Sequence, residues 1–133
     1  MNYFEKARPA IQTEHFVCGS YQKAVSENYF TALNPADQKP VAAFALGEAV
    51  DMKTAIDHAR RAFDKGRWPK MSPKERGEIL QNFARLIKKK AKFLGIVESL
   101  TVGKLLDDCI NHDVARAAEN IEFFAKEMEL GEK

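Results

Sequence analysis

The spacing of apolar residues changes near residue 48, and this change constrains the fold more than any other feature of the chain. Residues 15–47 carry short runs rich in β-forming residues, separated by turn residues. Residues 48–133 carry apolar residues at i, i+3, i+4 and i+7, which is the pattern of amphipathic helices. No later strands follow to extend the early ones. The sequence therefore predicts an α/β chain, residues 1–133, that forms a single partial domain.

The first third of the chain is expected to form β-hairpins. Residues 1–14 are an irregular or short helical lead, in which Pro9 prevents a long helix. Gly19-Ser20 is a two-residue turn signal that would join the first two strands, and Asn34–Lys39 is a turn by composition. The predicted strands are His15–Cys18, a run from Tyr21, Tyr29–Leu33 and Val41–Leu46.

About four helices are predicted in the remainder. Ser72 and Glu75 form a capping box with Pro73 at the first helical position, so a helix begins there. Gly66 and Gly103 are expected to stop the helices that precede them. The predicted helices contain Met52–Phe63, Pro73–Ile87, Phe93–Leu100 and Leu106–Met128, the last with Ile110, Val114, Ala117, Ala118, Ile121, Phe124, Ala125 and Met128 on one face.

Composition excludes several classes of protein. The net charge of +2 gives no basis for binding nucleic acid or an anionic membrane. Two cysteines do not make a disulfide framework, and we find neither a signal peptide nor an apolar stretch of the ~20 residues that span a bilayer. A cytoplasmic location is the resulting expectation.

Local motifs provide no catalytic or nucleotide-binding residue. The seven glycines form no phosphate-binding loop. Cys18 is expected in a buried apolar strand, and Cys109 follows Asp107 and Asp108, so both settings disfavour a reactive thiolate. Cys109, His112 and Asp113 lie close enough on one helix to suggest a zinc site, although a solvated helix surface is the simpler interpretation.

A series of short motifs, in order, resembles the aldehyde dehydrogenase superfamily from about residue 15 to the C-terminus. Leu33-Asn34-Pro35-Ala36 is similar to the Asn-Pro-Ala turn of that family, and Trp68 with Met71–Arg76 is similar to its Trp and Met-Ser-Pro-x-Glu-Arg junction. The other similar segments are Ala55–Phe63, Ile79-Leu80 with Leu86-Ile87, Glu98–Lys104, Asp113-Val114 and Ala117–Ala125. The resemblance implies the N-terminal portion of an aldehyde dehydrogenase-like cofactor-binding domain.

The resemblance also implies what the chain lacks. Enzymes of this family oxidise aldehydes with NAD or NADP, using a cysteine thiolate, an oxyanion-binding asparagine and a glutamate that activates water. The resemblance places these residues, and those that hold the cofactor, in segments beyond residue 133. We therefore assign no catalytic and no cofactor-binding residue, and we expect a truncated dehydrogenase that binds no cofactor and is inactive alone.

One binding site of the family falls inside the matching region. Many members hold a monovalent cation with two backbone carbonyls before the Asn-Pro turn and an aspartate. The resemblance assigns these positions to Ala32, Leu33 and Thr101, where Thr101 replaces the anionic ligand. Gln38 stands where the turn usually has glycine, so we expect a different turn conformation there.

Two other functions remain open from the sequence. Apolar stripes such as Leu86 with Leu94, or Ile121 with Phe124, would form a partner surface in a small helical interaction module. Cys109, His112 and Asp113 would form the site of a metal-binding module. The expected partners are a second copy of the chain or a complementing dehydrogenase fragment.

Overall fold

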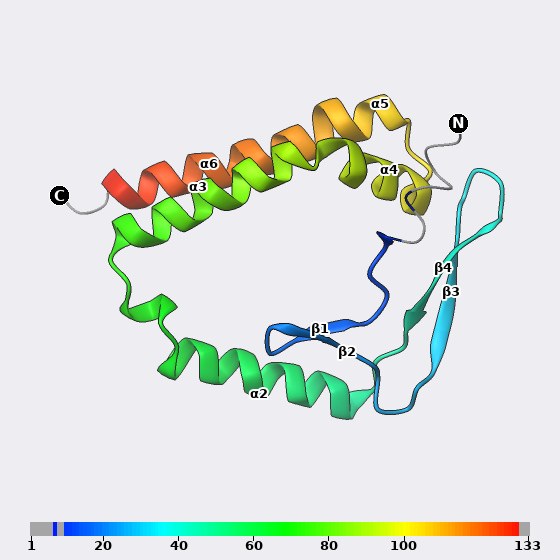
Figure 1. Cartoon of the computed structure of the whole chain (residues 1–133), viewed down its shortest axis with the longest axis horizontal. Helices are drawn as coiled ribbons and strands as arrows, with labels where there is room; N and C mark the ends of the chain where they lie inside the picture. The colour runs from blue at the N-terminus through cyan, green and yellow to red at the C-terminus, as the bar shows by residue number, and fades with distance from the viewer. Residues whose placement is uncertain (1–6, 8–9, 131–133) are drawn as a thin grey trace.

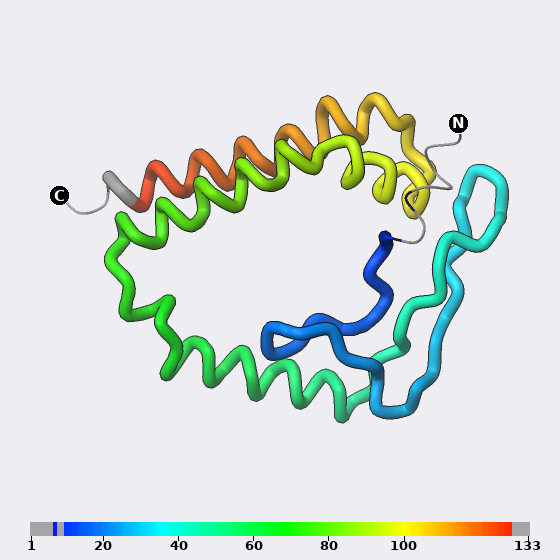
Figure 2. The backbone as a smooth tube through the Cα atoms, in the orientation of Figure 1, coloured from blue at the N-terminus to red at the C-terminus, as the bar shows by residue number. Residues whose placement is uncertain are grey.

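The computed structural model describes residue 7 and residues 10–130. The chain follows an open loop in which α3 (Pro73–Lys89) and α6 (Ala115–Leu130) lie side by side along one side (Figure 1). α2 (Ala49–Lys65) runs along the opposite side, and two β-hairpins lie between it and α4 (Ala91–Val102) (Figures 1 and 2). The predicted α/β chain of hairpins followed by about four helices is confirmed.

The first hairpin pairs β1 (His15–Val17) with β2 (Ser20–Gln22). Its turn residues are Cys18 and Gly19, with φ of 54° and 82°, so the predicted Gly19-Ser20 turn is wrong by one residue. Positive φ at both central residues is the conformation of a type I′ turn, whose twist matches that of the flanking strands. Cys18 is therefore exposed in the turn, and its predicted burial in a strand is also wrong. Of the predicted lead, residues 1–6, 8 and 9 lie outside the described residues.

The second hairpin pairs β3 (Tyr29–Leu33) with β4 (Pro40–Ala45), with a register shift between Ala32 and Leu33. Asn34 organises the predicted turn: its Oδ1 accepts from the Ala36 N–H at 3.0 Å, and its backbone carbonyl accepts from the Gln38 N–H at 2.8 Å. β3 has the predicted bounds, whereas β4 begins and ends one residue earlier than the predicted Val41–Leu46. The two hairpins form separate two-stranded sheets.

α2 begins where Asp51 satisfies two backbone donors. Its Oδ2 accepts from the Glu48 N–H at 2.9 Å, and its Oδ1 accepts from the Val25 N–H at 3.0 Å. These hydrogen bonds stabilise the carboxylate and lower the pKa of Asp51 from 3.8. All seventeen residues of α2 are described and none is buried, so apolar side chains such as Met52 and Ile56 remain exposed.

The connection from α2 to α3 contains a 3-10 helix, Trp68–Lys70. The predicted capping box is confirmed: the Glu75 N–H donates to Ser72 Oγ at 3.2 Å, and Glu75 Oε2 accepts from the Ser72 N–H at 2.8 Å. α3 then packs along α6 through small side chains, since Ala84, Ala118 and Ala125 have no exposed surface. Lys88 Nζ also lies 2.7 Å from Glu122 Oε1, which pairs the two helices at their edge.

The last helical segment contains a π-helical turn. α5 (Leu106–Asp108) continues through the π-helix Cys109–Val114 into α6. The extra residue of a π-turn places Cys109 and Val114, five positions apart, on the buried side. The predicted apolar face missed Cys109, and it wrongly included Phe124, which is 63% exposed. Val114, Ala118 and Ala125 are buried as predicted.

The packed core lies at the end of the molecule that holds α4. It consists of Ala7, Val41, Ile96 and Leu100, with Ile11, Phe93 and Leu106 partly buried against it. Gly103 ends α4 with a φ of 77°, as predicted for a left-handed cap. Within the described residues, no helix has the length and apolar character that crossing a bilayer requires.

A substitution at Gly95 tests how closely α4 approaches the π-turn. A Cβ at this position would lie 3.1 Å from the backbone N and Cα of Ile110, and it would also contact the Ile110 side chain. Gly95→Ala should therefore lower the free energy of unfolding by about 1–3 kcal/mol, although alanine favours helix elsewhere. Urea unfolding would measure this loss. The double variant with Ile110→Ala should lose less free energy of unfolding than the sum of the two single variants, because the side-chain clash is then removed. A Gly95→Ala variant that is more stable than the native chain would contradict the close contact.

Asp51 should make the stability of the chain dependent on acid pH. Because folding lowers the pKa of Asp51, its stabilisation is present above the unfolded value of 3.8 and is lost as pH falls through the folded-state value. Asp51→Asn should lower Tm at neutral pH and flatten its decrease between about pH 5 and pH 2. Thermal unfolding across that range checks both. Asp64→Asn, which removes an exposed carboxylate paired with Arg60 on the same helix, is the control; an equal flattening there would contradict the assignment.

Candidate functional site

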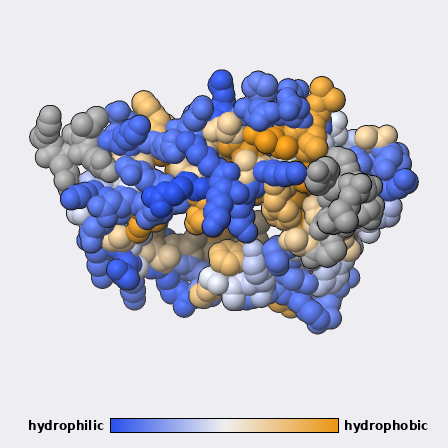
Figure 3. Space-filling model, turned by 45° about the horizontal axis from the view of Figure 1, so that its top comes forward, coloured by the Kyte–Doolittle hydropathy of each residue, from blue (hydrophilic) through white to orange (hydrophobic). Residues whose placement is uncertain are grey.

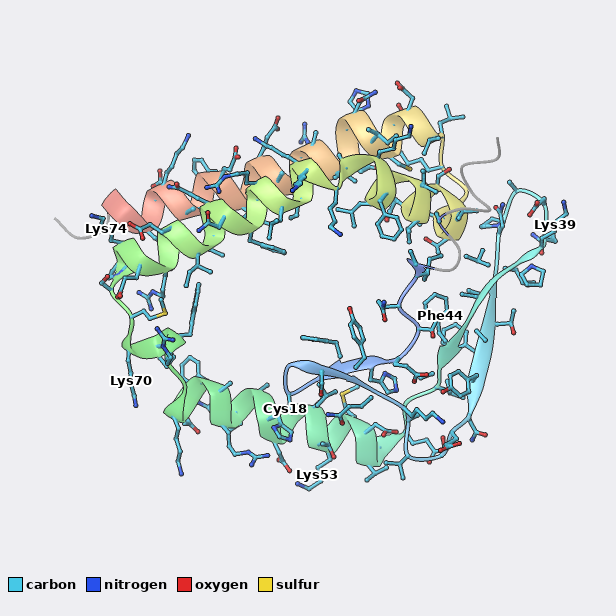
Figure 4. The ribbon with its side chains drawn as sticks, viewed as in Figure 1. Cys18, Lys39, Phe44, Lys53, Lys70 and Lys74 are labelled. Carbon is cyan, nitrogen blue, oxygen red and sulfur yellow. The ribbon has the colours of Figure 1, made fainter. Side chains whose placement is uncertain are left out.

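One concave surface of the described chain is an apolar groove with a volume of about 940 Å³. It is lined by Ala10–Gln12, by Phe44 (labelled in Figure 4) and by residues of α3, α4, the π-turn and α6. In Figure 3, hydrophobic surface gathers toward the end of the molecule where α4 and α5 lie. The lining side chains from the helices are Phe83, Leu86, Ile87, Lys90, Phe93, Leu94, Val97, Glu98, Thr101, Asp113, Val114 and Ala117.

Two of the polar groups that line this groove, on Asp113 and Thr101, are engaged within the chain. Lys104 Nζ donates to Asp113 Oδ1 at 2.7 Å and to Oδ2 at 2.6 Å, and this contact raises the pKa of Lys104. The Thr101 hydroxyl donates to the Val97 carbonyl at 2.9 Å. Neither group is positioned as a nucleophile or general base, so the groove is suited to apolar contact rather than to bond-making chemistry.

The residues of the predicted metal module do not form a site. Asp113 is bound by Lys104, His112 Nδ1 lies 3.3 Å from Asp108 Oδ1, and Cys109 has no exposed surface. No group of three or more metal-ligating side chains is found in the part of the chain that the structure describes. The metal-binding alternative is therefore not favoured.

Comparison with known proteins decides the family. Residues 21–133 match the family model described as "Aldehyde dehydrogenase family". The chain belongs to the aldehyde dehydrogenase family. It is 32% identical over 120 residues to the NADP/NAD-dependent aldehyde dehydrogenase PuuC of Escherichia coli (strain K12), covering 90% of this chain and 24% of that one. It is 39% identical over 93 residues to betaine aldehyde dehydrogenase of Bacillus subtilis (strain 168), covering 70% and 19%.

Solved structures of aldehyde dehydrogenases share the fold. The chain superposes on KauB from Pseudomonas aeruginosa with a TM-score of 0.87 and 32% identity, covering 95% of this chain and 26% of KauB. AldA of P. syringae, solved in complex with NAD+ and IAA, gives a TM-score of 0.87 at 28% identity, covering 95% and 26%. This aldehyde dehydrogenase chain thus spans about a quarter of the length of the relatives it matches.

The two cysteines of the aldehyde dehydrogenase chain lie in different environments. Cys109 is buried in the π-turn, and burial raises the pKa of its thiol, with Asp113 adding to the shift. A neutral buried thiol is a poor nucleophile, as the sequence indicated for this residue. Cys18 lies at the tip of the first hairpin (Figure 4) and is not among the groove residues.

The turn that follows Ala32 and Leu33 of the predicted cation site packs against the end of α4. A Cβ on Gly103 would lie 3.1 Å from Pro35 Cβ, so the Asn34-Pro35 turn packs against the end of α4, where Thr101 lies. Thr101 Oγ1 donates its hydrogen to the Val97 carbonyl of the same helix. Leu33 is exposed and lies beside the register shift of β3. A cation site at Ala32, Leu33 and Thr101 stays a prediction.

The groove itself was not predicted as a unit. The sequence indicated Leu86 and Leu94 as parts of an apolar stripe, which is a local signal. It gave no sign that Phe44 and Ala10–Gln12 would face the same helices, because those residues lie far away in the chain and lack a shared period. Only the tertiary contacts bring them together.

Gln38 keeps the turn conformation that glycine would adopt, so the expected change of turn is wrong. Its φ is 58°, and its side-chain Nε2 donates to the Pro35 carbonyl at 3.2 Å. Gln38→Gly should relieve the left-handed strain and raise the free energy of unfolding by on the order of 0.5–1 kcal/mol. Urea unfolding measures the gain. Lys39→Gly is the control, because φ is not positive at Lys39, and it should lower the free energy of unfolding. Equal changes in the free energy of unfolding for the two variants would contradict strain at Gln38.

Proposed function

We propose that this chain is the N-terminal segment of the cofactor-binding domain of an NAD(P)-dependent aldehyde dehydrogenase and has a structural role in that domain. The observation that carries the proposal is the fold match to KauB, which extends over 95% of this chain but only 26% of KauB. Aldehyde oxidation would then require polypeptide that the matched region does not include. A reducing, cytoplasmic compartment is part of the proposal, supported by two free cysteines.

The described residues do not fit a dinucleotide by themselves. A pyrophosphate needs several backbone N–H groups aimed at one point, usually at a helix N-terminus. Gly103 has positive φ but caps the C-terminus of α4, where the helix dipole disfavours an anion. Gly95 and Gly66 are packed against Ile110 and Ala62, which prevents close approach of a phosphate. We derive no step through the cofactor from these residues.

Catalysis is likewise not assigned to this chain. The family reaction needs a thiolate at the carbonyl carbon and donors that hold the oxyanion. Cys109 is sequestered and its thiol has a raised pKa, and Cys18 lies away from the groove at a hairpin tip. What this chain contributes is the packed end around Leu100 and the groove that it supports.

Calorimetry with NAD and with NADP tests the proposal. The purified chain should give no binding heat with either dinucleotide, and it should not reduce them in the presence of an aldehyde. A chimera in which this chain replaces the matching segment of KauB should bind the dinucleotide, because the rest of the cofactor domain is then supplied. Full-length PuuC is the positive control. Micromolar binding by the isolated chain, or a folded chimera that cannot bind dinucleotide, would contradict the proposed function.

A further inference from the structure

We propose that this chain has lost the monovalent-cation site that its family implies, and that direct apolar packing holds its second hairpin on the end of α4 instead. The positions concerned are Ala32, Leu33 and Thr101. The stability of the chain is then independent of Na⁺ and K⁺. This inference depends on the family of the chain and on its own side chains, so it goes beyond the proposed function and does not rest on it.

The three positions offer only neutral oxygen donors. Thr101 Oγ1 shares its hydrogen between two carbonyls of its own helix, that of Val97 at 2.9 Å and that of Glu98 at 3.2 Å. It can therefore offer a lone pair to a cation but no negative charge. Neutral oxygens replace the water around K⁺ when rings of backbone carbonyls surround the ion. Two carbonyls and one hydroxyl are a much smaller donor set, and they lack the carboxylate that would compensate a cation for losing its water.

Two neighbouring carboxylates are already paired with lysines. Asp113 accepts from Lys104 Nζ with both oxygens, at 2.7 and 2.6 Å. Asp37, in the turn that packs against α4, accepts from the Lys39 N–H at 3.1 Å and lies 3.6 Å from Lys39 Nζ. The C-terminal end of α4 adds the partial negative charge of a helix dipole, which is roughly half an elementary charge. That charge is smaller than the one that an aspartate at position 101 would supply.

Apolar contacts close the junction that a cation would otherwise bridge. The register shift of the second hairpin falls at Val41, which has no register partner in β3 although the residues on either side of it do. Val41 is 5% exposed and packs in the core with Ile96 and Leu100 of α4. At the end of the same helix, a Cβ on Gly103 would lie 3.1 Å from Pro35 Cβ. The hairpin is thus attached to α4 at two places by contacts that need no ion.

Thermal unfolding in NaCl, KCl and tetramethylammonium chloride of equal ionic strength tests the proposal. Thr101→Asp restores a carboxylate, so its Tm should be at least ~3 °C higher in NaCl or KCl than in tetramethylammonium chloride, because an ion that binds the folded state stabilises it. Thr101→Asn is the matched uncharged control. Glu98→Gln removes an exposed carboxylate one helical turn before Thr101. The native chain and these two neutral variants should respond to the three salts alike, within about 1 °C.

Two outcomes would overturn the proposal. NaCl or KCl could raise the Tm of the native chain by ~3 °C or more beyond their effect on Thr101→Asn or on Glu98→Gln, which would show that the native side chain at that position holds an ion. Alternatively, Thr101→Asp and Thr101→Asn could respond equally to the three salts, which would show that the missing carboxylate is not the reason for cation independence.

Sodium-23 NMR keeps the test decisive if Thr101→Asp does not fold. Sodium that exchanges with a protein site gives a broadened resonance, and the native chain, Thr101→Asn and Glu98→Gln should broaden it equally. Greater broadening by the native chain would overturn the proposal. Neither measurement involves a dinucleotide, so NAD binding by the isolated chain would contradict the proposed function and leave this inference unaffected.

Discussion

The close approach of α4 to the π-helical turn is the constraint on which the packed end of this molecule depends. Gly95 allows it, because any side chain there would meet the backbone of Ile110. The approach places Leu100 and Cys109 in the interior and fixes α4 as one wall of the groove. From this end the chain opens outward: α3 and α6 are joined by an alanine seam, whereas α2 runs along the far side with no buried residue (Figure 1).

The contrast between these two regions shows which parts of the aldehyde dehydrogenase fold are defined by local signals in this chain. Local signals, such as the capping box at Ser72 and the left-handed cap at Gly103, define the helices independently of distant contacts. The ion pair of Lys104 with Asp113 satisfies charge at the groove. The large apolar side chains Phe83 and Leu86 are different, since they remain half exposed in this chain.

The success of sequence-based prediction followed the same division. The strand Tyr29–Leu33 and the helix that begins after Ser72 were correctly predicted, because alternation and capping act over a few residues. The turn at Cys18 was misplaced, because a cysteine at positive φ has no compositional signal. The π-turn was missed because one extra residue in a helix leaves no mark on composition, and the burial of Cys109 was missed with it. The groove required contacts between distant segments, which no local pattern encodes.

The misplaced hairpin turn has a practical consequence. One thiol, at Cys18, stands at an exposed tip, and the other, at Cys109, is enclosed by protein and kept protonated. Alkylating reagents attack accessible thiolates, so the native chain offers a single attachment point for a fluorophore or spin label without any engineering. A reporter placed there would sit on the hairpin beside α2, which has no buried residue, and would respond to changes in the surroundings of that hairpin.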